Sequence, residues 1–201
     1  KEIGAHYPLI ELSLAIIFLM VAWKHAQGML SGVCIQAFSN VGPERVIGDY
    51  IFVLFLATLF IFDLKHKLIP DAVVLPAAAV AFVWNLILGM NIFNLLLAAT
   101  IGAGFFFLQY LVSKGRWIGE GDIRIGAMMG LMLGWPKIVP AIFISYLLGA
   151  GVSLFLLGAK KASMKTALPF GTFLSIGTFI TLLWGNEILA WYLNLSGLKA
   201  C

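Results

Sequence analysis

The sequence predicts an all-α fold: a polytopic membrane helical bundle with about seven transmembrane spans, forming a single membrane-embedded domain over residues 1–201. The chain is 62% hydrophobic and only 11% charged, whereas soluble domains are roughly a quarter charged. Apolar segments long enough to cross a bilayer follow one another along the whole chain. We see no internal repeat and no alternating strand pattern between them.

The apolar segments are expected at 9–23, 46–63, 72–90, 92–112, 122–134, 138–158 and 168–193. The first has the length of a signal peptide, but it lacks a basic flank and a small-residue cleavage site, and six more segments follow it. The fifth is the shortest, so we expect polar flanking residues to extend it.

Positive charges predict the topology. When the two sides are numbered alternately from the N-terminus, side one carries Lys1, Lys65, Lys67, Lys114, Arg116, Arg124, Lys160, Lys161 and Lys165. Side two carries Lys24, Arg45, Lys137 and Lys199. The excess predicts that side one is cytoplasmic. The basic residues are therefore explained by topology and by contact with lipid headgroups, and we expect no nucleic-acid partner.

Two acidic residues lie at span ends on this cytoplasmic side. Asp63 ends the second segment, and Asp122 begins the fifth within Gly119-Glu120-Gly121-Asp122. A carboxylate at the edge of a bilayer is costly, which makes both residues functional candidates. If the two meet, they share a proton, so that one activates water as a base and the other acts as an acid. This pattern predicts an aspartyl protease, with the two roles unassigned.

Other residues are expected to support this pair. Gly119 and Gly121 allow loop conformations and close approaches that side chains would block. Pro70 stops any helix from continuing through the cytoplasmic loop after Asp63.

A stripe of glycines follows Asp122. Gly126, Gly130 and Gly134 are spaced four residues apart, so they share one helical face with the acid and allow another helix to approach it. The alternative is that these glycines only pack the bundle and that Asp122 caps the start of its helix.

These motifs resemble the type IV prepilin peptidase family of membrane aspartyl proteases. The resemblance rests on Asp63 with Leu68-Ile69-Pro70-Asp71 and on the run from Gly119 to Gly130, and it extends to Tyr7-Pro8-Leu9-Ile10-Glu11-Leu12 and Pro169-Phe170-Gly171. It implies that Asp63 and Asp122 are catalytic and that Asp71 is not.

The resemblance also implies a substrate and a location. Family members remove the basic leader peptide of type IV prepilins or type II secretion pseudopilins after a glycine, at the cytoplasmic face of the bacterial inner membrane. Cleavage then needs no metal and no organic cofactor. Longer members carry a preceding span and a loop with two Cys-x-x-Cys pairs suited to zinc, and many methylate the new N-terminus with S-adenosylmethionine. We expect zinc, S-adenosylmethionine and methyl transfer only in a longer parent protein.

Three polar positions have less specific interpretations. Glu11 could bind the basic leader, or could equally pair with a neighbouring basic or backbone group. Asp49 and Arg45, on the outer side, are expected to form a solvated interfacial pair. His66 has no cysteine or histidine at ligand spacing, so a metal site is not expected there.

Two rival functions stay open. A preflagellin or presenilin-like protease of the same motif type is one, although Phe62 stands where a presenilin-like protein would usually have tyrosine. An ion-coupled transporter is the other, but it would place its acids near the bilayer midplane, whereas Asp63 and Asp122 lie at span ends.

Overall fold

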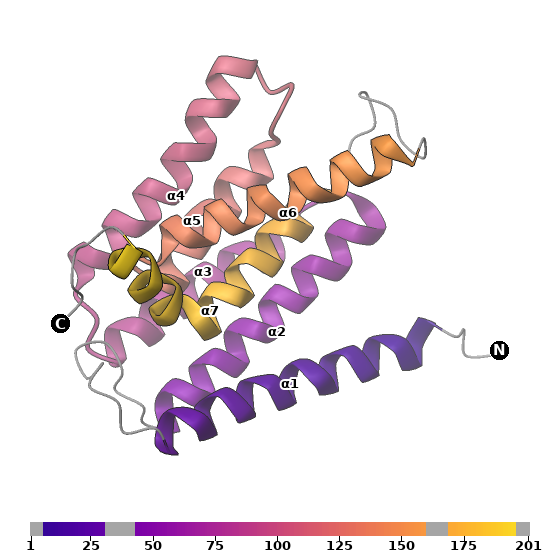
Figure 1. Ribbon diagram of the computed structural model, residues 1–201. Helices are drawn as coiled ribbons and strands as arrows, with labels where there is room; N and C mark the ends of the chain where they lie inside the picture. The colour runs from indigo at the N-terminus through magenta and orange to yellow at the C-terminus, as the bar shows by residue number, and fades with distance from the viewer. Residues whose placement is uncertain (1–5, 31–42, 160–168, 196–201) are drawn as a thin grey trace. The chain divides into compact units, whose positions relative to one another are not determined.

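The computed structural model describes residues 6–30, 43–159 and 169–195, and in these ranges all regular secondary structure is α-helical. The helices are α1 (His6–Leu30), α2 (Pro43–His66), α3 (Asp71–Ile87), α4 (Ile92–Ser113), α5 (Glu120–Leu133), α6 (Ile138–Gly158) and α7 (Phe170–Leu195) (Figure 1). Each coincides with a predicted apolar segment, which confirms the all-α prediction. Lys160, Lys161 and Lys165 lie outside the described residues.

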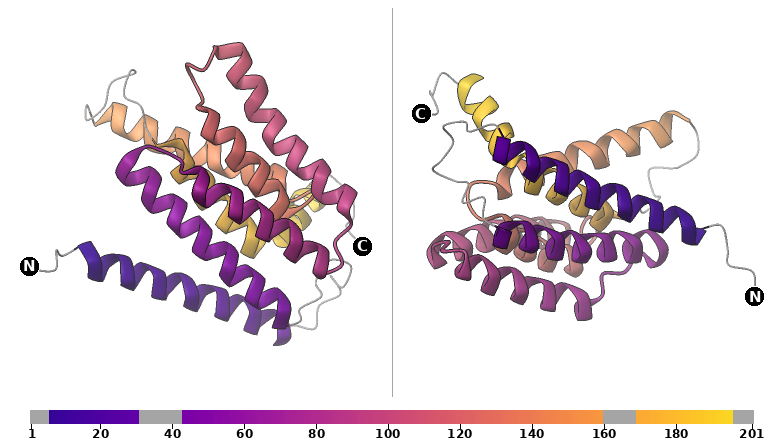
Figure 2. Two further views of the ribbon diagram at one scale, coloured as in Figure 1. Left: turned by 180° about the vertical axis from the view of Figure 1, so that it is seen from behind. Right: turned by 90° about the horizontal axis from the view of Figure 1, so that it is seen from below.

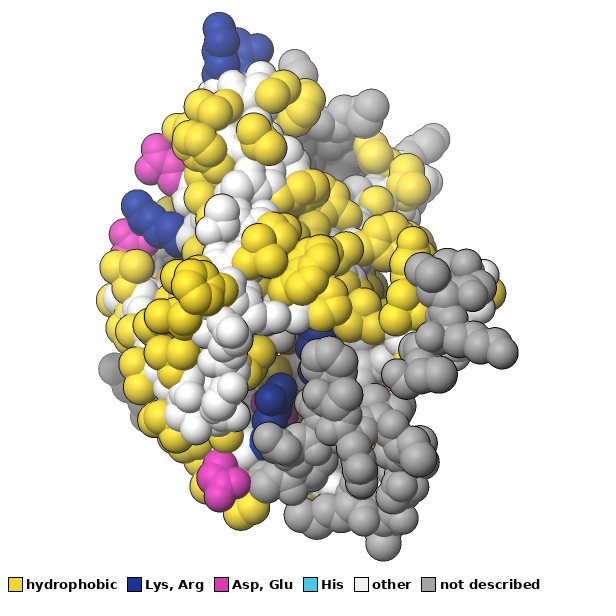
Figure 3. Space-filling model, turned by 90° about the vertical axis from the view of Figure 1, so that its left-hand side faces the viewer, with side chains coloured by type: hydrophobic (Ala, Val, Ile, Leu, Met, Phe, Trp, Pro, Cys, Tyr) yellow, Lys and Arg dark blue, Asp and Glu magenta, His cyan; other side chains and the backbone are white. Residues whose placement is uncertain are grey.

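Apolar length separates the helices into groups. Among the described residues, α2, α4, α6 and α7 are long and apolar enough to cross a membrane, and α3 is a shorter apolar helix. Large hydrophobic side chains such as Phe93, Phe143 and Phe155 are exposed on these helices, and hydrophobic atoms make up much of the surface in Figure 3. An exposed apolar surface of this extent suits contact with lipid rather than water.

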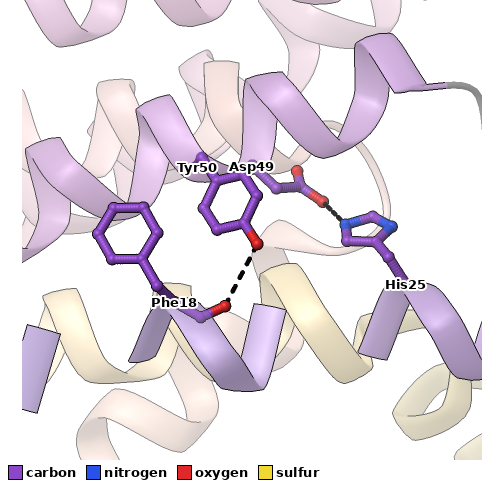
Figure 4. Close-up of polar contacts among 4 residues, drawn as sticks. All are labelled: Phe18, His25, Asp49 and Tyr50. Carbon is purple, nitrogen blue, oxygen red and sulfur yellow. Dashed lines mark hydrogen bonds and ion pairs between the residues drawn. The ribbon is translucent and has the colours of Figure 1, made fainter. Parts of the chain in front are cut away.

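The chain forms two compact units, Lys1–Ile51 and Phe52–Ala200. A single domain therefore stays a prediction. In the first unit, the Phe18 and Tyr50 rings stack with centroids 5.0 Å apart, and the Tyr50 hydroxyl donates to the Phe18 carbonyl (Figure 4). Beside them, His25 Nε2 lies 3.0 Å from Asp49 Oδ2.

The expected solvated pair of Asp49 and Arg45 is wrong. Asp49 is only 5% exposed, and its described partner is the imidazole of His25 on α1. A buried carboxylate needs a close partner, and His25 lies within reach beside the stacked Phe18 and Tyr50 rings. A charge pattern alone does not reveal which side chains become buried.

In the second unit, α5 contacts α3, α4, α6 and α7. Its glycine stripe packs on α4: Gly126 faces the backbone of Gly102, and Gly130 faces the backbone of Ala98. Figures 1 and 2 show the two helices side by side. The predicted close approach is confirmed, and its partner is α4 rather than the helix that carries Asp63. Such contacts between small residues are typical of helix packing in membranes.

Two asparagine side chains fix the C-terminal end of α5. Asn85 of α3 donates to the carbonyls of Leu131 and Met132, at 2.7 and 3.2 Å. Asn94 of α4 donates to the Trp135 carbonyl and accepts from the Trp135 amide, at 3.1 and 2.9 Å. The last carbonyls of a helix have no partner within it, so these amides satisfy polar groups that apolar surroundings would leave unpaired.

Candidate active site

Asp63 lies in the last turn of α2 and is only 4% exposed. Its Oδ2 accepts two hydrogen bonds from Thr172, one from the backbone amide at 2.6 Å and one from the hydroxyl at 3.0 Å. Thr172 is in the first turn of α7, where backbone N–H groups have no partner within the helix. The start of α7 therefore holds the carboxyl group of Asp63 in one orientation.

Asp122 is the third residue of α5 and is 6% exposed. Its Oδ2 accepts from the Gly119 amide at 3.1 Å, so the carboxyl group does satisfy the start of its own helix. Its other oxygen, Oδ1, is buried and has no hydrogen-bond partner among the described residues. Because capping uses only one oxygen, the capping role does not account for the whole carboxyl group.

Gly171 lies next to both the Asp63 carboxyl group and α5. A Cβ atom at Gly171 would lie 3.0 Å from Asp63 Oδ2 and 3.2 Å from Ile125 Cδ1. Ile125 follows Asp122 by one helical turn, so the Asp63 carboxyl group lies beside the face of α5 that carries Asp122.

The supporting residues predicted from the sequence lie in different places. Gly119 donates to Asp122, and Gly121 packs against Ile69, whose Cδ1 would lie 2.8 Å from a Cβ at that position. Pro70 directly precedes α3 in an extended conformation, so the helical path is broken there as expected. Glu11 is exposed on α1 in the other unit, and its role in substrate binding stays a prediction.

The match with known proteins covers this region. A family model described as the type IV leader peptidase family matches residues 50–154, which include both aspartates. The chain belongs to the type IV leader peptidase family. With its several long apolar helices, it is a multi-pass membrane protein.

Three curated relatives are named prepilin leader peptidase/N-methyltransferase. The chain is 31% identical to the one from Pseudomonas aeruginosa over 98% of its own length and 64% of the relative. It is 31% identical to the one from Xanthomonas campestris over 99% of the chain and 66% of the relative. It is 28% identical to the one from Legionella pneumophila over 94% and 62%. The chain thus spans less than two thirds of these relatives. No solved structure matches it significantly.

Thr172, which binds Asp63 in the candidate site, was not predicted from the sequence. It directly follows Pro169-Phe170-Gly171, the last of the stretches that resemble the family. Its position at the start of an apolar segment was the available signal, because a helix start offers unpaired N–H donors to a carboxylate.

An aromatic cluster adjoins the site. The Tyr146 ring lies 5.1 Å from Phe170 and 6.4 Å from Phe106, measured between centroids, and its hydroxyl donates to Gln109 Oε1 at 2.7 Å. Glu120, next to the glycines of the motif, accepts from the Tyr110 hydroxyl at 3.1 Å. Across the described ranges, no three histidine, cysteine, aspartate or glutamate side chains gather as a metal site would require.

Proposed function

We propose that this chain is an aspartic endopeptidase that removes the basic leader peptide of type IV prepilins or type II secretion pseudopilins. The observation that carries the proposal is the buried pair of carboxyl groups at the ends of α2 and α5, within the segment that matches the leader peptidase family. Asp63 and Asp122 act together: one takes a proton from the attacking water, and the other protonates the carbonyl oxygen of the scissile peptide bond.

The local geometry supports the proposal that one carboxyl group acts as the base and the other as the acid. Thr172 fixes one oxygen of Asp63, and Gly119 fixes one oxygen of Asp122. Each carboxyl group therefore has an orientation held by a backbone donor, and Oδ1 of Asp122 has no hydrogen-bond partner among the described residues. Such preorganisation lowers the cost of reaching the transition state.

The proposed location is the bacterial inner membrane, with the site facing the cytoplasm. Lys65 and Lys67 follow Asp63 in the chain, and Arg116 and Arg124 flank Asp122. Loops rich in lysine and arginine are retained on the cytoplasmic side. The hydrophobic part of a prepilin would lie in the bilayer beside the bundle, which would bring the bond to be cut to the depth of the aspartates.

Cleavage on this account uses the two carboxyl groups and water alone. We assign neither methyl transfer nor a zinc or S-adenosylmethionine site to these 201 residues. We propose methyl transfer and the zinc and S-adenosylmethionine sites only for a longer parent protein.

The test is incubation of the purified chain, in detergent or lipid, with a purified prepilin and with the same prepilin carrying a bulky residue in place of the glycine before the cut. Mass spectrometry identifies the products. One cut after the glycine of the unmodified prepilin, and none in the altered one, is expected. Cleavage at unrelated sites would favour another membrane protease. Proton or cation flux in vesicles without cleavage would favour the transporter.

A further inference from the structure

The connection between α2 and α3 lies against the first turns of α5. The Ile69 side chain packs on Gly121, and the Asp71 carboxylate forms an ion pair with the Arg124 guanidinium. Gly121 and Arg124 stand on either side of Asp122 in the sequence. Residues 67–70, here called the α2–α3 connection, and Asp71, the first residue of α3, therefore touch α5 at the residue before its acid and at the second residue after it.

The same connection begins four residues after the other acid, Asp63. The Lys67 amide donates to the Asp63 carbonyl at 2.8 Å, and Lys67 has a positive φ of 50°, which turns the chain away from the helix. Pro70 then directly precedes α3, and its ring fixes its own backbone angle φ. One short segment is thus joined by covalent bonds to Asp63 and by side-chain contacts to the turn that carries Asp122.

Stability does not explain the ion pair well. The Arg124 and Asp71 side chains are 44% and 50% exposed. An ion pair this exposed adds little to the free energy of folding. The reaction rate depends more strongly on where the two carboxyl groups lie, because a shift of about 1 Å between reacting groups can lower the rate about 100-fold.

We propose that Asp71 and Arg124 are positioning residues, which hold the first turns of α5 on the α2–α3 connection and thereby set the placement of Asp122 relative to Asp63. Neither side chain touches the reacting atoms in this proposal. The inference rests on the proposed peptidase function for its consequence in catalysis, but the geometric coupling itself is independent of that function.

The kinetic test uses Arg124→Gln, Asp71→Asn and the double variant, with prepilin as substrate. Each single variant is expected to lower kcat by about tenfold or more with little change in KM, and the double variant to be no slower than either single one. Arg124→Lys, which keeps the charge, should recover part of the loss. Arg116→Gln is the matched control, since it removes an exposed positive charge from the loop before α5 and should leave kcat unchanged.

Three kinetic results would overturn the proposal: unchanged kcat in the single variants, additive losses in the double variant, or equal losses in Arg116→Gln. A change confined to KM would also overturn it, because that would indicate binding of the leader rather than placement of Asp122.

A second test needs no activity. In a background of Cys34→Ser and Cys201→Ser, the pair Ile69→Cys and Gly121→Cys should form a disulfide under mild oxidation, because a Cβ atom at residue 121 would lie 2.9 Å from Ile69 Cβ and a shift of about 1 Å gives the separation that a disulfide needs. Adding Arg124→Gln should slow this reaction several-fold, whereas adding Arg116→Gln should not. An unchanged rate with Arg124→Gln would refute the coupling. If the unmodified chain does not cleave prepilin, the peptidase proposal fails. The crosslinking rate then decides by itself whether the Asp71–Arg124 ion pair holds α5 on the α2–α3 connection.

Discussion

Replacing Gly126 by alanine would place a methyl group in the contact between α5 and α4. The added carbon would lie 2.5 Å from Phe106 Cδ2 and 2.6 Å from the Gly102 carbonyl oxygen. Carbon atoms in contact are about 3.5–4.0 Å apart, so the new carbon is about 1 Å too close to Phe106. Phe106 cannot turn aside easily, because it is fully buried and packs against Phe170. The two helices must therefore move apart.

Overpacking of this kind costs about 1–3 kcal/mol, which exceeds the gain of up to about 1 kcal/mol from replacing a helical glycine by alanine. For a chain of this size a net loss of about 1–2 kcal/mol corresponds to a fall of about 2–8 °C in the thermal midpoint. The assay is tryptophan fluorescence during heating in detergent. Gly104→Ala is the matched control on α4, since nothing lies within 4 Å of its added carbon. Equal midpoints for the two variants would refute the packing argument.

Further predictions concern polar contacts of both units. Thr172→Val removes the hydrogen bond from the hydroxyl to Asp63 and should lower kcat about tenfold, whereas Thr172→Ser should retain most of the activity. Equal rates for the two variants would show that the hydroxyl does not contribute to catalysis. Gly171→Ala places a carbon 3.0 Å from the Asp63 carboxylate and should reduce cleavage with little change in the thermal midpoint, so full activity would contradict the close approach. Asp49→Ala leaves His25 without this buried partner and should lower unfolding free energy by about 1–3 kcal/mol, with Asp49→Asn less affected; no difference between them would show that the contact is not stabilising.

Hydropathy predicted the helices well because apolar length is the property that a membrane span must have. The sixth segment was expected at 138–158, and α6 covers Ile138–Gly158. Pro70 and the polar loops gave clear ends to the second and third segments. Both acids were predicted at helix ends on one side, and the structure places them in the last turn of α2 and the first turn of α5.

Contacts between distant segments could not be read from these patterns. Thr172 lies 109 positions after Asp63, and no periodicity indicates which helix start will face a given carboxylate. The glycine stripe on α5 predicted a close approach but not that α4 would make it. Asp49 carries the same charge whether solvated or buried, so only the packing of α1 on α2 reveals His25 as its partner.

The measurement that tests the central claim most directly is the initial rate of prepilin cleavage by the unmodified chain, Asp63→Asn and Asp122→Asn. Asp49→Asn is the control, because it makes the same substitution at a buried aspartate outside the candidate site. Asparagine keeps the size of the side chain but removes the ionisable carboxyl group. We predict that both active-site variants lose cleavage while remaining folded and that Asp49→Asn retains it. Normal cleavage by either Asp63→Asn or Asp122→Asn would contradict the two-aspartate site.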